Sequence, residues 1–314
     1  MSQAPPPAIL SSEEHPLVGS RARHRREAGI RWVFLGAALT SILISVLIVA
    51  SLIEEASAFL TSVDLSALWG DGWFPRRGLF DVKTIVVGSL LVTGIAMLVA
   101  APLGLAAAIY LSEYARSGTR RFVKPVLEIL AGIPSVVLGF FALTWISPNL
   151  VAPFCGGRSL FNLAAAGIGV GVLVTPLVAS VSEDALRAVP ASLREASYGL
   201  GARKLATTLR VVIPAAVSGL VAAMIIAVSR AIGETMVVVI AAGGSGNAPF
   251  TADVCSPGQT MTAAIASIAS GTDQVKGATN AFQSLFFVGL LLFVITFVLN
   301  VAGERFVRRV RQRY

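Results

Sequence analysis

The most specific feature of the sequence is a polar stretch between two long apolar runs, "EDALRAVPASLREASYGLGARKLATTLRVVIP", from Glu183 to Pro214. Pro190 suits the start of a helix, because its missing N–H has no partner there in any case. Ser192, with Glu195 three residues later, is typical of an N-terminal cap. The pattern predicts a short helix from about Leu193.

Two glycines then interrupt the helical pattern. Gly199 and Gly201 break or tighten the chain, and a second helix is expected from about Arg203 toward Pro214. A helix, a glycine turn and a second helix form a compact knob. An ordinary basic loop is the alternative, but the length and internal order of the stretch argue against it.

The whole chain has the composition of an integral membrane protein. Of its 314 residues, 55% are hydrophobic and only 13% are charged, and the mean hydropathy is +0.78. Soluble domains carry roughly 25% charged residues. The net charge of +8 could indicate nucleic-acid binding, so the basic residues must first be compared with the membrane topology.

Six apolar runs are long enough to cross a bilayer, which needs about 20 residues in a helix. The sequence predicts an all-α protein with a sizeable loop at 54–83 and local kinks at the three prolines within spans, Pro102, Pro134 and Pro176. The six predicted spans are Trp32–Ile53, Thr84–Leu111, Val126–Ile146, Leu163–Val181, Val211–Ala242 and Ser284–Ala302.

The basic residues predict the orientation of these spans. Nineteen of the 25 Lys and Arg residues lie in the N-terminal tail, the loops after the second and fourth spans, and the C-terminal tail. The opposite loops hold five, and Arg230 is the last. Positive charge favours the cytoplasmic side, so both termini are predicted to be cytoplasmic. Residues 1–31 are expected to form a disordered basic tail, and residues 304–314 a second basic tail. Because the membrane topology explains the basic residues, the net charge no longer supports nucleic-acid binding.

The chain has two cysteines, Cys155 and Cys255, and both lie in loops placed outside the cytoplasm. That compartment permits disulfides. The sequence leaves two possibilities open, a disulfide between them or two unlinked thiols.

No motif for bond chemistry is present. No Lys follows a Gly, so the phosphate-binding loop of ATPases is absent. The two histidines, His15 and His24, lie in the polar tail, and no Cys/His cluster has metal-ligand spacing. The sequence therefore predicts no metal, no cofactor and no enzymatic activity for this chain.

The polar stretch resembles the signature E-A-A-x3-G-x9-I-x-L-P of ABC importer permeases. Glu195, Ala196 and Ser197 are followed at the right spacing by Gly201 and by "VVIP", which ends at Pro214. Ser replaces the second Ala, and Val and Ile replace Ile and Leu. The resemblance implies that 183–210 is a coupling loop whose helix fits a groove on a separate ATPase subunit.

Three further stretches resemble the phosphate permeases PstC and PstA. They are "FPRRGLFDVKTIVVGSLLVTGIAMLVAAPLGLAAAIYLSEYA" (Phe74–Ala115), "LEILAGIPSVVLGFFAL" (Leu127–Leu143) and "SRAIGETM" (Ser229–Met236). The leading span and sizeable first loop are more similar to PstC. The resemblance implies a type I ABC importer fold in a bacterial inner membrane, a PstA-like second permease, a PstB-like ATPase and a PstS-like phosphate-binding protein.

Arg230 and Glu234 are the only charged residues within the predicted fifth span. As i and i+4 residues of one helix they would share a face, with Arg230 roughly 24 Å along the axis from Pro214. Arg costs about 2.5–3.5 kcal/mol at a bilayer centre, so this face is expected to line protein or a water-filled path. One reading is an internal salt bridge, and the other is an anion site on the substrate path.

Glu234 suggests a hypothesis about selectivity. Phosphate carries one or two P–OH protons near pH 7, whereas sulfate carries none. A carboxylate accepts a hydrogen bond from P–OH and repels bare sulfate oxygens, so Glu234 would exclude sulfate. The alternative is that a separate binding protein makes the whole selection.

Weaker candidates and rival functions remain. Glu128 near the cytoplasmic end of the third span is expected either to extend to the membrane surface or to pair with Lys124. Gly167 and Gly171 suit close helix packing, and Ser135 could offer donors to an anion. The rival functions are a permease for sulfate or molybdate, an ion-coupled secondary carrier, and a scaffold without transport.

Overall fold

The computed structural model of the protein describes residues 21–70, 72–157, 159–243, 248–270 and 279–310. The chain divides into two compact units, Met1–Ser51 and Leu52–Tyr314. Helix α1 (Arg21–Ser62) crosses the boundary between them. Its first 11 described residues belong to the segment predicted as a disordered tail, and that prediction is wrong for 21–31, while 1–20 lie outside the described residues.

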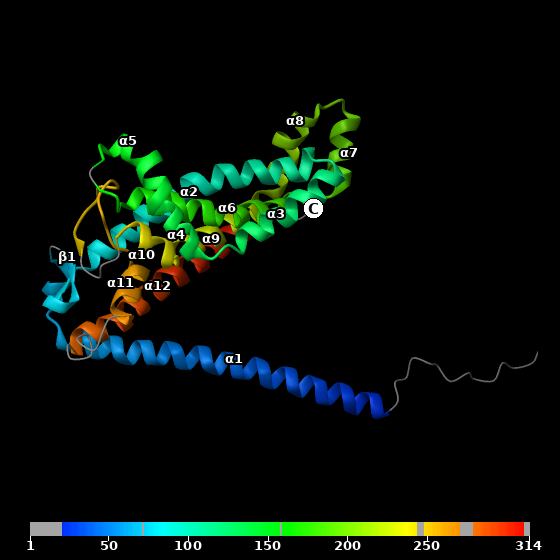
Figure 1. Ribbon diagram of the computed structural model, residues 1–314. Helices are drawn as coiled ribbons and strands as arrows, with labels where there is room; N and C mark the ends of the chain where they lie inside the picture. Colours follow the sequence, from blue (N-terminus) through cyan, green and yellow to red (C-terminus); the bar gives the residue numbers. More distant parts are fainter. Residues whose placement is uncertain (1–20, 71, 158, 244–247, 271–278, 311–314) are drawn as a thin grey trace, which may run out of the picture. The chain divides into compact units, whose positions relative to one another are not determined.

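Within the described residues, six helical runs are long and apolar enough to cross a membrane, so the predicted six-span all-α class is confirmed. They are built from α1, α2 (Val82–Ile109) with η3 (Tyr110–Tyr114), α4 (Ser135–Phe141) with η4 (Ala142–Val151) and α5 (Ala152–Cys155), α6 (Leu163–Arg187), α8 (Lys204–Thr207) with η5 (Thr208–Val212) and α9 (Ile213–Ile232), and α12 (Thr279–Val310) (Figure 1).

The third span differs from the prediction of Val126–Ile146. The chain forms a separate helix α3 (Ser117–Ala131), turns at 132–134, and only then enters the span Ser135–Cys155. Pro134 is the physical reason, since it cannot donate a backbone hydrogen bond and disfavours a helical residue before it. Glu128 belongs to α3 and therefore lies outside the span. None of the side chains of α3 is buried.

The fifth span also differs, because the predicted continuous helix Val211–Ala242 is interrupted. Helix α9 ends at Ile232, and a short helix α10 (Met236–Ala241) begins after a three-residue break. Pro102 and Pro176 instead stay inside α2 and α6. The last helix continues to Val310, beyond the predicted end at Ala302.

The largest core lies where α2 packs along α6 (Figure 1). A Cβ on Gly167 would lie 2.7 Å from Ile95 Cβ, and one on Gly171 would lie 2.8 Å from Val99 Cβ. The two helices can approach this closely only because these positions have no side chain. The predicted close packing at the G-x-x-x-G is thus confirmed, with α2 as the partner.

A second core forms around aromatic side chains in the predicted loop at 54–83. Three short strands, β1 (Gly72–Phe74), β2 (Leu79–Phe80) and β3 (Ala248–Pro249), pair antiparallel in the order β2-β1-β3. Phe80 packs edge-on against Phe59 of α1 at 4.9 Å and Trp73 at 6.0 Å between ring centroids. The short helices η1 (Leu65–Trp69) and η2 (Pro75–Arg77) complete this loop, and α11 (Met261–Ala269) packs against it.

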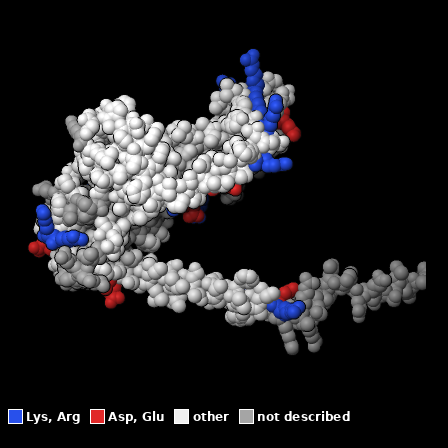
Figure 2. Space-filling view, viewed as in Figure 1, with Lys and Arg blue, Asp and Glu red and all other residues white. Residues whose placement is uncertain are grey.

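Basic residues gather at one end of the bundle. Figure 2 shows Lys and Arg over the end formed by α7 (Ala191–Gly199) and α8, and a largely uncharged surface between this end and the strands. An uncharged middle suits contact with hydrocarbon, where a charged side chain is costly.

Candidate functional site

The break between α9 and α10 contains the charged pair. The N–H of Glu234 donates to Ala231 O (3.2 Å), which closes the last turn of α9, and Gly233 is the C-cap. The carbonyl of Glu234 accepts from the hydroxyl of Thr262 on α11 (2.7 Å). The interrupted helix leaves this carbonyl without a partner within the helix, and the hydroxyl of Thr262 supplies one. Irregular backbone at membrane depth requires such a partner.

Glu234 is buried, with 6% of its surface exposed. Its Oε1 lies 3.5 Å from the N–H of Val237, at the start of α10. A carboxylate in that position is favoured by the free amides of a helix N-terminus. The prediction that Glu234 shares one continuous helix face with Arg230 is wrong, because α9 ends at Ile232 and Glu234 lies in the break before α10.

Arg230 is exposed in the last turn of α9. Among the described residues, no ion pair joins it to Glu234, so the salt bridge considered from the sequence is not formed. The neighbouring Ser229 donates to Asn300 of α12 (3.2 Å), which holds the end of α9 against α12. A fully charged guanidinium that is left exposed in a span can bind a group from outside this chain.

The stretch 183–210, predicted to be a coupling loop, contains the two helices expected from the sequence, α7 and α8. Gly201 connects them with φ +79°, a conformation that residues with a side chain rarely adopt. Ser197 and Thr207 join the two helices by a hydroxyl hydrogen bond of 2.8 Å. Ser192 is not the N-cap: α7 already begins at Ala191, after Pro190, and no side chain caps it.

Two exposed residues of the stretch that contains α7 and α8 were missed by sequence reasoning. Glu195 and Ala196 of the signature are exposed, and Ser197 is half-buried. Leu200 is 89% exposed and Leu205 is 61% exposed on the same loop. Apolar side chains so exposed on a polar loop indicate a contact surface for another protein. The signal in the sequence was an apolar residue between the two turn glycines, Leu200, and another in the polar segment after them, Leu205.

A charge cluster joins α3 to the end of α6. Glu183 is almost fully buried, and its carboxylate lies 2.7 Å from Arg120 Nε and 3.7 Å from Lys124 Nζ. The hydrogen bond from Lys124 to Asp184 (3.1 Å) is the main cause that raises the pKa of Lys124. Lys124 thus pairs with α6 residues, and the predicted pairing with Glu128 is not formed among the described contacts. Ser135 is half-buried at the start of α4, and no described contact gives it a role.

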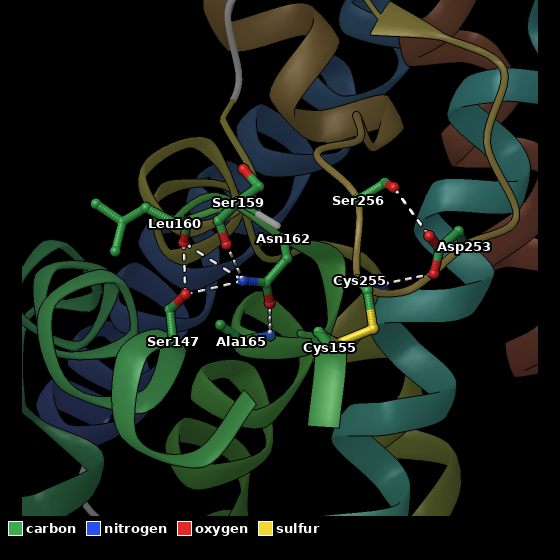
Figure 3. The surroundings of a disulfide bond; sticks show 9 residues. All are labelled: Ser147, Cys155, Ser159, Leu160, Asn162, Ala165, Asp253, Cys255 and Ser256. Carbon is green, nitrogen blue, oxygen red and sulfur yellow. Dashed lines mark hydrogen bonds between the residues drawn. A yellow bond between two sulfur atoms is a disulfide. The ribbon is translucent and has the colours of Figure 1, made fainter. Parts of the chain in front are cut away.

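Cys155 and Cys255 form a disulfide at the opposite end of the bundle (Figure 3). Cys155 ends α5, Cys255 lies in the loop after β3, and their Cα atoms are 5.5 Å apart. The carboxylate of Asp253 accepts from the N–H of Cys255 and the hydroxyl of Ser256, both at 3.0 Å. The bond closes a loop of 100 residues.

The cross-linked loop also caps α6. Ser256 O accepts from Leu163 N (3.2 Å), and Val254 O accepts from Ala164 N (2.9 Å). Asn162 Oδ1 accepts from Ala165 N at 2.7 Å (Figure 3). These bonds satisfy amides that have no partner within the helix, so the loop keeps its position by hydrogen bonds as well as by the disulfide.

We expect loss of the disulfide to destabilise this end of the protein without unfolding the spans. A disulfide that closes a long loop contributes about 2–4 kcal/mol. The variant Cys155→Ser/Cys255→Ser should show a lower thermal midpoint in detergent, and reductant should lower the wild type to the same value. Equal midpoints for the variant and the untreated wild type would contradict this expectation. Alkylation and mass analysis with and without reductant check that the bond is formed.

The structure defines the class of protein. Six apolar helical runs, an interrupted span with an exposed arginine, and an exposed helix–turn–helix at the basic end are the features of a membrane transport subunit that works with a separate protein. The chain belongs to the family of binding-protein-dependent transport system inner membrane components, whose model matches residues 100–312. It is therefore a transport subunit and not an enzyme.

Relatives agree with this family. The chain is 35% identical over 240 residues to the probable ABC transporter permease protein YqgH of Bacillus subtilis, covering 76% of this chain and 74% of that protein. It is 31% identical over 272 residues to the phosphate transport system permease protein PstC of Mesorhizobium japonicum, covering 81% of each.

Solved structures agree in fold. The crystal structure of a bacterial ABC transporter involved in the import of the acidic polysaccharide alginate is similar with a TM-score of 0.64 and 15% identity, covering 92% of this chain and 100% of that chain. At this identity the likeness concerns the fold alone, and it supports the predicted ABC importer permease fold.

Proposed function

We propose that this chain is a permease subunit of an ATP-driven importer of inorganic phosphate. The observation that carries the proposal is Arg230, an exposed guanidinium without an ion-pair partner in the described part of the chain, at a break within a span. Its planar fork of donors matches phosphate oxygens. The PstC proteins among its relatives support phosphate as the anion.

The importer needs further subunits. A PstA-like permease would complete the path, a PstB-like ATPase would bind α7, and a PstS-like binding protein would deliver phosphate. Closure of two ATPases on ATP would pull the two coupling helices together and open the path toward the loaded binding protein. After hydrolysis the path would face inward, and phosphate would leave Arg230 for the cytoplasm.

The orientation is part of the proposal. The basic end with α7 and α8 would lie in the cytoplasm, together with both termini, because basic loops are retained on that side. The disulfide end would then face the compartment in which disulfides are stable. The test uses reduced vesicles and a protease or a thiol-directed label. If either probe reaches Cys155 only from the cytoplasmic side, this orientation is contradicted.

Uptake of labelled phosphate tests the function. Cells that lack this chain should take up phosphate slowly at low concentration, and the cloned chain should restore uptake. Arsenate should compete, and sulfate should not. If sulfate or molybdate competes more strongly than phosphate for uptake, the chain is a permease for that oxyanion. Uptake that persists without any ATPase partner would identify a secondary carrier, and unchanged uptake on deletion would identify a scaffold.

Glu234 is proposed to exclude sulfate. In Glu234→Gln the charge that repels sulfate oxygens is absent, while the amide oxygen can still accept from P–OH and from Val237 N. We expect excess sulfate to inhibit phosphate uptake severalfold in this variant and not in the wild type. If sulfate still fails to compete, the selection is made by the binding protein.

A further inference from the structure

The side chain of Arg194, in the predicted coupling loop, has three hydrogen-bond partners outside α7. Its Nη1 donates to Val189 O (2.6 Å), and its Nη2 donates to Leu186 O and to Glu113 Oε1, both at 2.9 Å. Arg194 is 19% exposed and Glu113 is 5% exposed, so the ion pair is largely shielded from water. Charge-assisted hydrogen bonds of this length are strong, and a forked guanidinium fixes their geometry.

These contacts join α7 to two core helices. Leu186 lies in the last turn of α6, and Val189 lies two residues beyond the end of that helix, so Arg194 binds carbonyls that a helix end leaves without partners. Glu113 lies in η3, which continues α2. Helices α2 and α6 form the largest helix–helix contact of the protein. Arg194 therefore connects the exposed α7 to the two helices of this contact, and Leu193 of α7 packs against the apolar cluster at their ends.

The connection of α7 to α8 is less rigid than its connection to α2 and α6. Along the chain, α7 leads through Gly201 to α8 and from there to α9, which carries Arg230. The glycine turn contributes no packing side chain, and nothing lies within 4 Å of the position where its Cβ would be. The hydroxyl pair of Ser197 and Thr207 and a backbone bond from Ala202 N to Ser197 O (3.2 Å) span this turn. A displacement of α7 could be absorbed by rotation at Gly201, which tolerates conformations that other residues do not.

We propose that Arg194 is a positioning residue that makes α7 move as one body with α2 and α6. The proposal rests on the proposed function, in which an ATPase subunit moves α7. With the Arg194–Glu113 clamp in place, that displacement reaches the core helices and opens or closes the path. Without the clamp, the displacement ends at Gly201, and ATP is hydrolysed without transport.

The test uses the complete importer, reconstituted in vesicles with its ATPase and binding protein. The measured quantity is the number of ATP molecules hydrolysed per phosphate imported. Arg194→Lys keeps the charge, but a single ammonium cannot make the forked contacts. We expect the ratio to rise about fivefold or more, the lower end of usual allosteric coupling, while the ATPase still copurifies.

A simple loss of folding must be separated from loss of coupling. Removing Arg194 alone would leave Glu113 buried with, among the described residues, only the hydroxyl of Ser112 as a side-chain partner (3.0 Å), which is costly. The double variant Glu113→Gln/Arg194→Gln removes both charges and leaves no buried ion. It should be produced at the wild-type level and show the same rise in the ratio.

Arg309→Gln is the matched control. Arg309 is exposed in the last turn of α12 and has no ion-pair partner among the described residues, so its loss should leave the ratio unchanged. A wild-type ratio in the well-folded double variant would overturn the proposal, as would loss of ATPase copurification in Arg194→Lys, which would make Arg194 a docking residue.

A wild-type complex that imports no phosphate would instead refute the proposed substrate. In that case the same variants are compared by the stimulation of ATP hydrolysis by the binding protein. Loss of the stimulation with an unchanged basal rate supports the clamp, and full stimulation overturns it.

Discussion

Arg230→Gln is expected to lower phosphate uptake by roughly 10- to 100-fold, the effect of removing one hydrogen bond to a charged group. The protein level should stay normal, because Arg230 is exposed and has no ion pair in the described part of the chain. The measurement is the initial rate of labelled phosphate uptake, divided by the amount of permease in the membrane.

Two further variants test whether the lower uptake is caused by loss of an anion contact at Arg230. Arg230→Lys keeps the charge and loses the fork, so it should recover only part of the uptake. Arg305→Gln removes an exposed basic residue of α12 and should leave uptake unchanged. If uptake in Arg230→Gln falls only in proportion to the protein level, Arg230 has a structural role and the proposed anion contact is wrong.

Leu200→Asp is expected to weaken the association of the ATPase by on the order of 30-fold or more, the size of an interface hot spot. Leu200 is 89% exposed at the end of α7, so a charge there costs this chain little stability by itself. In the complex, the same charge would be buried against the ATPase without a partner. Copurification of the ATPase with the tagged permease measures the effect.

Phe154→Asp is the matched control for this prediction. Phe154 is 90% exposed in α5, beside the disulfide and at the opposite end of the bundle from α7. It should not affect copurification of the ATPase, although it makes the same kind of change at an equally exposed apolar side chain. Normal copurification of Leu200→Asp would mean that the ATPase binds elsewhere.

The spans and the coupling loop could be predicted because their causes are local. A run of about 20 apolar residues crosses a bilayer in any context, and a glycine between two helical patterns predicts a turn. The first and last residues of the third span were predicted less accurately from the sequence. Pro134 appeared to be a kink within the span, whereas it separates α3 from α4.

The break at Glu234 could not be predicted from its neighbourhood. The sequence around Gly233 allows a continuous helix, since glycine is tolerated within spans. The partner that stabilises the break is Thr262 of α11, 28 residues away. Only the fold brings that hydroxyl to the carbonyl of Glu234, and so only the fold separates Glu234 from the helix face of Arg230.

The sequence by itself determined the class of protein, because hydrophobic length and the spacing of turn residues act within one segment. It determined neither which partner each charged group takes nor whether the two cysteines are bonded. Those outcomes were decided by the tertiary structure, which places Arg194 against Glu113, Lys124 against Asp184 and Cys155 against Cys255. The physical reason is range: a hydrogen bond or a disulfide requires contact, and here the contacting residues are 60 to 100 positions apart in the chain.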